Sequence, residues 1–198
     1  MRNKRGIPLM VSGVLLIFCA VALVGYNTWE DRAAGADVQK ILRQVEAQIA
    51  HGGAAQTAVL DEDAETQPLA AVASGGHSYL GVLDIPALGL TFPIMSEWSY
   101  PNLKLSPCRY RGSAAGGDLI IAGHNYESHF GRLKNLELGD LITYTDVDGS
   151  LYSYEVSDVV ILDGSAVAEM SAGDWDLTLF TCTVGGRQRV TVRCDLDE

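Results

Sequence analysis

The stretch "LTLFTCTVGGRQRVTVRC", residues 177–194, contains two short runs of apolar and β-branched residues separated by a Gly-Gly pair. Each run is typical of a β-strand, and the short connection between them is typical of a hairpin turn. A hairpin that turns at Gly185–Gly186 brings Arg189 back beside Cys182. We therefore predict that the chain ends in a pair of antiparallel strands.

Several segments upstream have the same short-strand character. They are residues 79–95 ("YLGVLDIPALGLTFPIM"), residues 118–125 ("DLIIAGHN") and residues 139–162, which contain a turn signal at Asp148–Gly149. Helix signals are scarce in this region, so the sequence predicts an all-β domain that is either a closed barrel or a sandwich. A barrel leaves no unpaired strand edge, which favours it for a domain exposed to solvent.

The beginning of the chain has the features of a membrane anchor. Residues 7–24 carry no charge, and at about 1.5 Å per residue they extend roughly 27 Å, close to the thickness of a bilayer core. Tyr26 and Trp29 follow this run, where aromatic side chains commonly lie at the membrane interface. We expect a single transmembrane anchor over residues 7–29.

The charges around the anchor predict its orientation. Basic residues stay on the cytoplasmic side of a membrane, and three of them lie in residues 1–6, which we expect to form a cytoplasmic tail. The rest of the chain is then extracellular, tethered to the plasma membrane. The alternative is a cleaved signal peptide with small residues at 33–36 ("AAGA"), but the apolar run is longer than such peptides usually have.

Residues 30–76 are expected to connect the anchor to the domain. Apolar residues recur at three- and four-residue steps over residues 31–50, which predicts an amphipathic helix. Residues 51–76 are rich in Ala, Gly and acidic residues without sustained periodicity, which predicts a flexible linker. We expect the folded domain to occupy residues 77–198.

The overall charge excludes one class of function. The chain has a formal net charge of -11, whereas a nucleic-acid-binding protein needs clustered Lys and Arg to displace counterions from phosphates. With 198 residues, the chain suits one globular domain and an accessory segment. We expect no nucleic-acid partner.

A thiol that attacks a carbonyl needs a group to exchange its proton and a donor to stabilise the oxyanion. His124 directly follows an apolar strand, and Arg189 lies on the strand that returns beside Cys182. The sequence leaves open whether Cys108 and Cys194 form a disulfide. The individual residues also fit ordinary packing or solvated charge, so their combination carries the catalytic hypothesis.

Three motifs resemble those of the sortase family: "TLFTC" at 178–182, "AGH" at 122–124 and "RVTVR" at 189–193. The resemblance runs from about Tyr79 to the C-terminus. It implies a closed eight-stranded β-barrel of the sortase type and a membrane-anchored cysteine transpeptidase on the outer face of a Gram-positive bacterium. Such enzymes cut an LPxTG-like sorting signal through a thioacyl intermediate and pass the acyl group to an amine.

The resemblance assigns a role to each candidate residue. It implies that Cys182 is the nucleophile, that His124 is the general acid and base, and that Arg189 is the oxyanion donor. His129 is the competing imidazole, but it lies beyond the strand in a loop or short helix, and we favour His124. Arg187 and Arg193 are interpreted as bystanders.

The resemblance also suggests that Ala122, Leu179 and Thr181 line the substrate groove. Strand alternation, however, puts Leu179 and Thr181 on the face opposite Phe180 and Cys182. A bend or bulge near Cys182 is therefore needed for both faces to meet the substrate. Core packing is the alternative for Leu179.

The expected partners are proteins with an LPxTG-like signal, and an amine of a peptidoglycan precursor or a pilin. The motifs leave the sortase subclass unresolved, although the short connection between Leu162 and Asp176 argues against class B. We expect no cofactor and no metal. The resemblance leaves open a calcium site like that of some class A sortases, although no acidic cluster identifies one. The alternative functions are an extracellular cysteine peptidase that uses water, and a non-catalytic β-domain that binds the cell wall.

Overall fold

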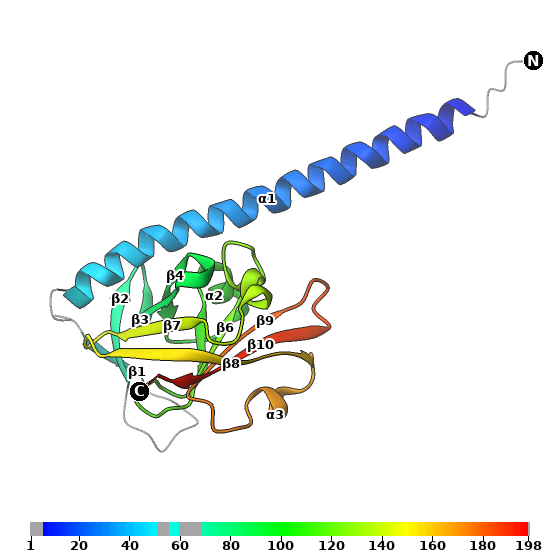
Figure 1. The fold of residues 1–198 in the computed structure, drawn as a ribbon. Coiled ribbons are helices and arrows are strands. Elements are labelled where there is room, and N and C mark those ends of the chain that lie inside the picture. Colours follow the sequence, from blue (N-terminus) through cyan, green and yellow to red (C-terminus); the bar gives the residue numbers. More distant parts are fainter. Residues whose placement is uncertain (1–5, 51–55, 60–68, 198) are drawn as a thin grey trace, which may run out of the picture.

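The computed structural model describes residues 6–50, 56–59 and 69–197. Its elements are α1 (Gly6–Ala50), β1 (Gln56–Val59), β2 (Leu69–Ser74), β3 (His77–Ile85), η1 (Pro86–Leu88), β4 (Leu90–Met95), α2 (Tyr100–Leu105), β5 (Cys108–Arg111), β6 (Leu119–Gly123), η2 (Phe130–Asn135), β7 (Leu141–Asp146), β8 (Leu151–Asp163), α3 (Val167–Met170), β9 (Leu177–Cys182) and β10 (Gln188–Leu196). Figure 1 shows the strands curled together, with α1 lying across one side of them and extending well beyond them.

Eight of the strands close into a barrel, as the sequence predicts. Neighbouring strands follow the order β3-β4-β5-β6-β9-β10-β8-β7, and β7 pairs with β3 to close the ring. Within this ring only the β4–β5 and β6–β9 pairs are parallel. Full closure leaves the ring without a free edge.

The interior of the barrel is filled by apolar side chains from alternate strand positions. On the last hairpin these are Leu177 and Leu179 of β9 and Val190 and Val192 of β10, all of them buried in one cluster. The same cluster contains residues of η2 and its C-terminal neighbour: Phe130, Leu133 and Leu136. These three side chains therefore anchor their segment against the barrel.

The hairpin that ends the chain has the predicted turn. Gly185 and Gly186 have positive φ angles of 89° and 72°, a conformation that favours glycine. The Thr183 amide donates to the Gln188 carbonyl at 2.9 Å, which holds the two strands together at the turn. This geometry directs the start of β10 back along β9.

The segment expected to be a flexible linker contains two strands. Within residues 51–76, β1 and β2 form an antiparallel hairpin, and β2 also pairs with the first residues of β3. Residues 51–55 and 60–68 lie outside the described part of the chain. The sequence of β2 shows little periodicity because the strand is short and rich in Ala. It is stabilised by backbone pairing with β3 and by packing against α1. The folded part of the chain thus begins before residue 77.

Helix α1 is continuous from Gly6 to Ala50, so the apolar run and the amphipathic segment form one element. Among the residues that the structure describes, it is the one helix long and apolar enough to cross a membrane, and its most apolar stretch is fully unburied. Its second half packs on the outside of the strands through Ala34, Val38, Leu42 and Val45, all 9% exposed or less. Their three- and four-residue spacing is the pattern that the sequence shows.

Candidate active site

Three strand ends bring the three predicted catalytic residues side by side. Cys182, the last residue of β9, is the direct partner of Arg189 on β10. On its other side, β9 runs parallel to β6 with Thr181 opposite Gly123, so Cys182 and His124 each follow the last pair by one residue. Strands pair at about 4.8 Å. The order across this end of the sheet is therefore His124, Cys182, Arg189.

The thiol of Cys182 lies on the outer face of the barrel. Leu179 on the same strand is fully buried in the interior, whereas Cys182 is partly exposed. The β9–β10 register runs without a shift from Arg189 to Cys194, so β9 has no bulge at Cys182. Strand alternation alone therefore decides which side chains share the face of the thiol.

The other two cysteines of the domain, Cys108 and Cys194, lie where a substrate does not reach them. Cys108 and Cys194 are fully buried and belong to different apolar clusters, one outside and one inside the barrel, and neither forms a disulfide. Burial raises the pKa of the Cys108 thiol to about 12 and also raises that of Cys194. Because the thiolate is the nucleophile, Cys182 is the candidate among the three.

His124 is half-buried on the loop that leaves β6. The ring of Tyr126 stacks on it, with ring centroids 3.8 Å apart. Its Nδ1 atom is buried and has no hydrogen-bond partner among the described residues. Burial lowers the pKa of His124, the Lys104 ammonium lowers it further, and the Glu30 carboxylate opposes both effects.

The glycine before His124 is required by packing. A side chain at Gly123 would collide with the ring of Phe130, whose backbone amide donates to the His124 carbonyl at 3.1 Å. The missing side chain lets the loop fold back tightly onto the barrel. This is the structural reason for glycine in the "AGH" sequence.

His129, the competing imidazole, is fully buried. Its ring lies between those of Phe92 and Tyr126, at centroid distances of 6.0 and 5.5 Å. Burial lowers its pKa to about 4, with the neighbouring His124 as a smaller cause. A neutral side chain without solvent access does not reach a substrate, which supports the choice of His124.

Arg189 is partly exposed beside Cys182. Its Nη1 atom donates to the carbonyls of Gly186 and Gln188 at 3.0 and 3.1 Å. These bonds hold the guanidinium against the turn and leave its other donors for a further acceptor. The Arg189 charge also contributes to lowering the pKa of the exposed Asp163, after the two Ser165 hydrogen bonds.

An apolar groove of about 210 Å³ lies beside Arg189, and β9 contributes Phe180 to its lining. Its lining includes three aromatic side chains, Trp98, Tyr110 and Phe180. Tyr110 packs edge-on against both of the others, at 6.0 and 5.3 Å. The opposite wall comes from the β8–β9 connection (residues 164–176), including Met170.

The three expected groove residues do not line this groove. Leu179 faces the barrel interior and is 0% exposed, while Ala122 and Thr181 are 1% and 2% exposed. Thr181 donates its hydroxyl to the Gly123 carbonyl at 2.8 Å, so it ties β9 to β6 next to His124. Alternation puts Leu179 and Thr181 on the face opposite Phe180 and Cys182, whereas Ala122 packs in the outer cluster that Phe180 also contacts. A role of the three residues in substrate binding stays a prediction. Sequence reasoning did not name Trp98, Tyr110 or Phe180 as groove residues. Of these three, only Phe180 could have been found from strand alternation, because it lies on the same strand as Cys182.

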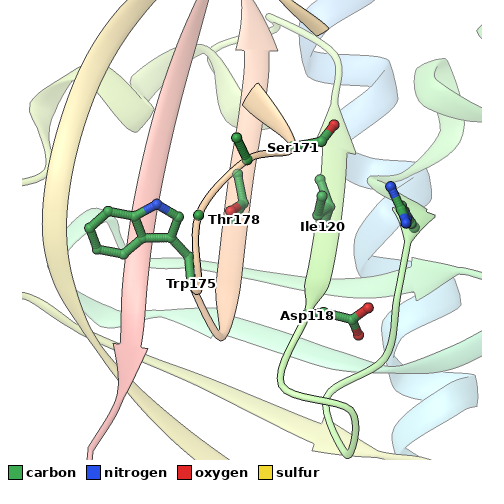
Figure 2. Close-up of a pocket in the computed structure, with 8 residues that line it drawn as sticks. Asp118, Ile120, Ser171, Trp175 and Thr178 are labelled. Carbon is green, nitrogen blue, oxygen red and sulfur yellow. The ribbon is translucent and has the colours of Figure 1, made fainter. Parts of the chain in front are cut away.

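A second hollow, shown in Figure 2, lies further along the same strands. Figure 2 shows Thr178 on β9 beside Ile120 on β6, and Ser171 and Trp175 of the β8–β9 connection also line the hollow. Thr178 and Ile120 are direct partners in the parallel pair. The β8–β9 connection thus walls both hollows.

Arg193 holds that connection against the barrel. Its guanidinium lies 5.5 Å from the ring centre of Trp175, donates to the Glu169 carbonyl at 2.9 Å and pairs with Asp158 at 3.4 Å. Tertiary contacts thus give Arg193 a structural role, while the expectation that it is a bystander in the chemistry stays a prediction. Within the described residues, no group of three or more His, Cys, Asp or Glu residues is arranged to hold a metal.

Fold and site together define a class: a closed eight-stranded β-barrel with a thiol, an imidazole and a guanidinium at adjacent strand ends. The chain belongs to the sortase family, since the Sortase domain model matches residues 83–197. Sortases are cysteine transpeptidases.

Solved structures with the same fold come from several sortase classes. They include a Clostridium perfringens sortase D5 transpeptidase (23% identity, 61% of this chain and 79% of that chain, TM-score 0.53). Sortase C1 of Streptococcus agalactiae is 25% identical over 64% of this chain and 71% of its own, with a TM-score of 0.56. Sortase A of Listeria monocytogenes is 23% identical over 61% and 88%, with a TM-score of 0.53. A comparison with curated proteins finds no match.

Proposed function

We propose that the chain is a membrane-anchored sortase that cleaves an LPxTG-like sorting signal and transfers the protein to an amine of the cell wall or of a pilin. One observation carries the proposal. Cys182 pairs with Arg189, and Cys182 and His124 each follow by one residue the last pair of β6 and β9, Gly123 and Thr181. Thioacyl transfer needs a thiol, a proton-transfer group and an oxyanion donor, and this register supports the proposal because it brings the three to one end of the sheet.

The reaction follows from these three side chains. Sγ of Cys182 attacks the carbonyl carbon of the scissile peptide bond, and Arg189 stabilises the negative charge on the oxygen. The thiol proton passes through His124 to the leaving amine as the C–N bond breaks, which leaves a thioester on Cys182. An incoming amine then attacks the thioester, gives its proton to His124 and releases the sulfur, which takes a proton again.

The groove suits the apolar part of such a signal. Trp98, Tyr110 and Phe180 offer aromatic faces to Leu and Pro side chains, and the groove reaches Arg189 at the reacting end. Short signals bind in largely preformed apolar clefts with a few polar groups at one end. Because Cys182 is partly exposed, both the signal peptide and the incoming amine can reach its thiol.

The N-terminal helix supports membrane anchoring. Apolar side chains from Leu9 to Val24 of α1 are exposed in the structure, and a bilayer would cover them. We propose residues 1–6 as a cytoplasmic tail, residues 7–29 as the anchor, residues 30–76 as the connecting region and residues 77–198 as the extracellular catalytic domain.

The test uses the full-length chain in lipid nanodiscs with a panel of fluorogenic LPxTG-type peptides, with and without triglycine. We expect cleavage, a triglycine-bearing product and a thioester on Cys182 detected by mass spectrometry. Cys182→Ala removes all three, and His124→Ala and Arg189→Ala lower kcat by about 10²- to 10³-fold.

Other outcomes identify the alternatives. Cleavage without any triglycine product indicates a cysteine peptidase that uses water. If no peptide in a wide panel forms a Cys182-dependent adduct, the enzyme proposal fails and a wall-binding domain remains.

A further inference from the structure

The end of the apolar part of α1 lies against the loop that carries His124. Glu30 accepts a hydrogen bond from the Tyr126 hydroxyl at 2.9 Å. One residue later, the Asp31 carboxylate accepts from the backbone amide of Ser128 at 3.0 Å and from its hydroxyl at 2.7 Å. These contacts join segments separated by 96 and 97 positions in the sequence. The juxtamembrane turn of α1 is therefore docked on the loop after β6.

Tyr126 connects that docking point to His124. Its ring stacks on the imidazole at a centroid distance of 3.8 Å and an interplanar angle of 32°. Burial, followed by the hydrogen bond to Glu30, raises the pKa of Tyr126 to about 12, so the hydroxyl keeps its proton and donates. The contacts run from Glu30 through Tyr126 to the imidazole without a gap.

No hydrogen bond restrains the buried side of this imidazole. Nδ1 of His124 is buried without a partner among the described residues, whereas catalytic imidazoles are usually oriented by a hydrogen bond at the second nitrogen. The stack on Tyr126 is thus the contact that sets the plane of the His124 ring. The orientation of Tyr126 depends in turn on Glu30.

We propose that Glu30 and Tyr126 are positioning residues for His124, so that docking of the juxtamembrane helix completes the active site. The proposal rests on the proposed transpeptidase function. It makes the anchor helix a part of the catalytic arrangement as well as a tether. It also places the reaction close to the membrane surface, because Glu30 directly follows the expected anchor.

The charged groups around His124 come from several elements and have opposing effects. Glu30 of α1 and Lys104 of α2 act on it directly, while Asp31 of α1 is bonded to Ser128 and His129 lies beside Tyr126 on the same loop. Lys104 and Glu30 also form an ion pair at 3.5 Å, with the lysine side chain 60% exposed. Loss of the Glu30 charge leaves Lys104 uncompensated, which lowers the pKa of His124.

The kinetic test compares variants of the full chain in nanodiscs with the peptide that the wild type cleaves. We expect Glu30→Ala and Tyr126→Leu to lower kcat at least about tenfold, with KM within about twofold. The Glu30→Gln side chain still accepts the Tyr126 hydrogen bond, so this variant keeps most of the wild-type kcat. Because it lacks the negative charge, the limb of the pH profile that His124 sets moves to lower pH. Glu46→Ala, an exposed acid on the same helix, is the matched control and leaves kcat unchanged.

A double variant tests whether the two residues act through each other. In a Tyr126→Phe background the hydroxyl is absent, so Glu30→Ala has little additional effect on kcat. Additive losses, or an unchanged kcat in Glu30→Ala with an intact fold by circular dichroism, overturn the proposal.

An NMR measurement separates this proposal from the proposed function. Histidine ring protons of the full chain in micelles are assigned with His124→Gln. The stack predicts an upfield ring-current shift for the His124 protons that disappears in Tyr126→Leu and shrinks in Glu30→Ala but not in Glu46→Ala. This result supports positioning even if no peptide is cleaved, and an unchanged shift in Glu30→Ala contradicts it even in an active enzyme.

Discussion

His124 and His129 show how burial separates two identical side chains on one loop. His124 is half-buried beside Cys182, whereas His129 is fully enclosed between aromatic rings. Burial lowers the pKa of both, and that of His129 falls to about 4. One imidazole is available for proton transfer, and the other behaves as a neutral packing residue.

The buried His129 predicts a pH dependence of stability. A pKa that is lower in the folded state than the unfolded value of 6.5 means that folding requires the neutral ring. The stability that it contributes is present above pH 6.5 and is lost as the pH falls toward about 4. We expect the urea midpoint of the wild type to fall over this range more steeply than that of His129→Phe.

Wild type must be compared with His129→Phe because the buried Asp146 changes the stability with pH in the opposite direction to His129. Burial raises the pKa of Asp146 from 3.8 to about 6, so its contribution to stability is lost as the pH rises through that interval. Asp146 is the same in both proteins and cancels in the difference. Parallel midpoints for wild type and His129→Phe between pH 7 and pH 4.5 would show that His129 titrates normally.

At the scale of elements, strand register positions the site and a single side chain holds the groove wall. The β9–β10 and β6–β9 pairs align the three catalytic candidates. The β8–β9 connection (residues 164–176) contains only a short helix, α3, and its contacts with Arg193 hold it against β10. The groove along β9 depends on this connection for one of its walls.

Loss of the Arg193 contacts should loosen the groove. We expect Arg193→Ala to raise KM for the cleaved peptide by about threefold to tenfold, because a cation–π contact and a charged hydrogen bond are lost. The value of kcat should change less, since Arg193 lies away from the thiol. Steady-state kinetics measure both constants.

Arg193→Lys is the matched variant, since it keeps the charge but not the planar fork. It should give an intermediate KM. A loss confined to kcat would instead assign Arg193 to the chemistry.

At the scale of the whole molecule, one helix joins the apolar N-terminal run to the barrel. The second half of α1 covers an outer apolar cluster that also includes Val72 of β2 and Met95 of β4. Figure 1 shows this part of α1 running along the strands before the helix leaves the domain. The strands of residues 77–196 close the barrel, but this outer cluster is left uncovered without the segments that precede them.

Truncation tests this dependence. A fragment that begins at residue 77 lacks Val38, Leu42 and Val45, each of which contributes about 1.5–3 kcal/mol when buried. We expect its free energy of unfolding to be lower than that of a fragment of residues 31–198 by roughly 5 kcal/mol. Urea denaturation of the two fragments measures the difference, and equal midpoints would mean that α1 packs only weakly on the barrel.

Much of the fold follows from local patterns. Alternation and turn residues predicted the last hairpin, the Asp148–Gly149 turn and an all-β domain, and the motif resemblance added the number of strands. The pairing of Cys182 with Arg189 follows from the position of the Gly-Gly turn. The β1–β2 hairpin escaped prediction because its stability comes from neighbours rather than from its own periodicity.

By itself, the sequence determined the strands, the apolar N-terminal run and the presence of a thiol, an imidazole and a guanidinium at strand ends, because these depend on residues near one another along the chain. Only the tertiary structure decided that Trp98 and Tyr110 join Phe180 in the groove lining, that Arg193 holds the β8–β9 connection, and that Glu30 meets Tyr126. The physical reason is that these contacts join segments far apart in sequence. Such contacts form only when the barrel closes and α1 packs against it.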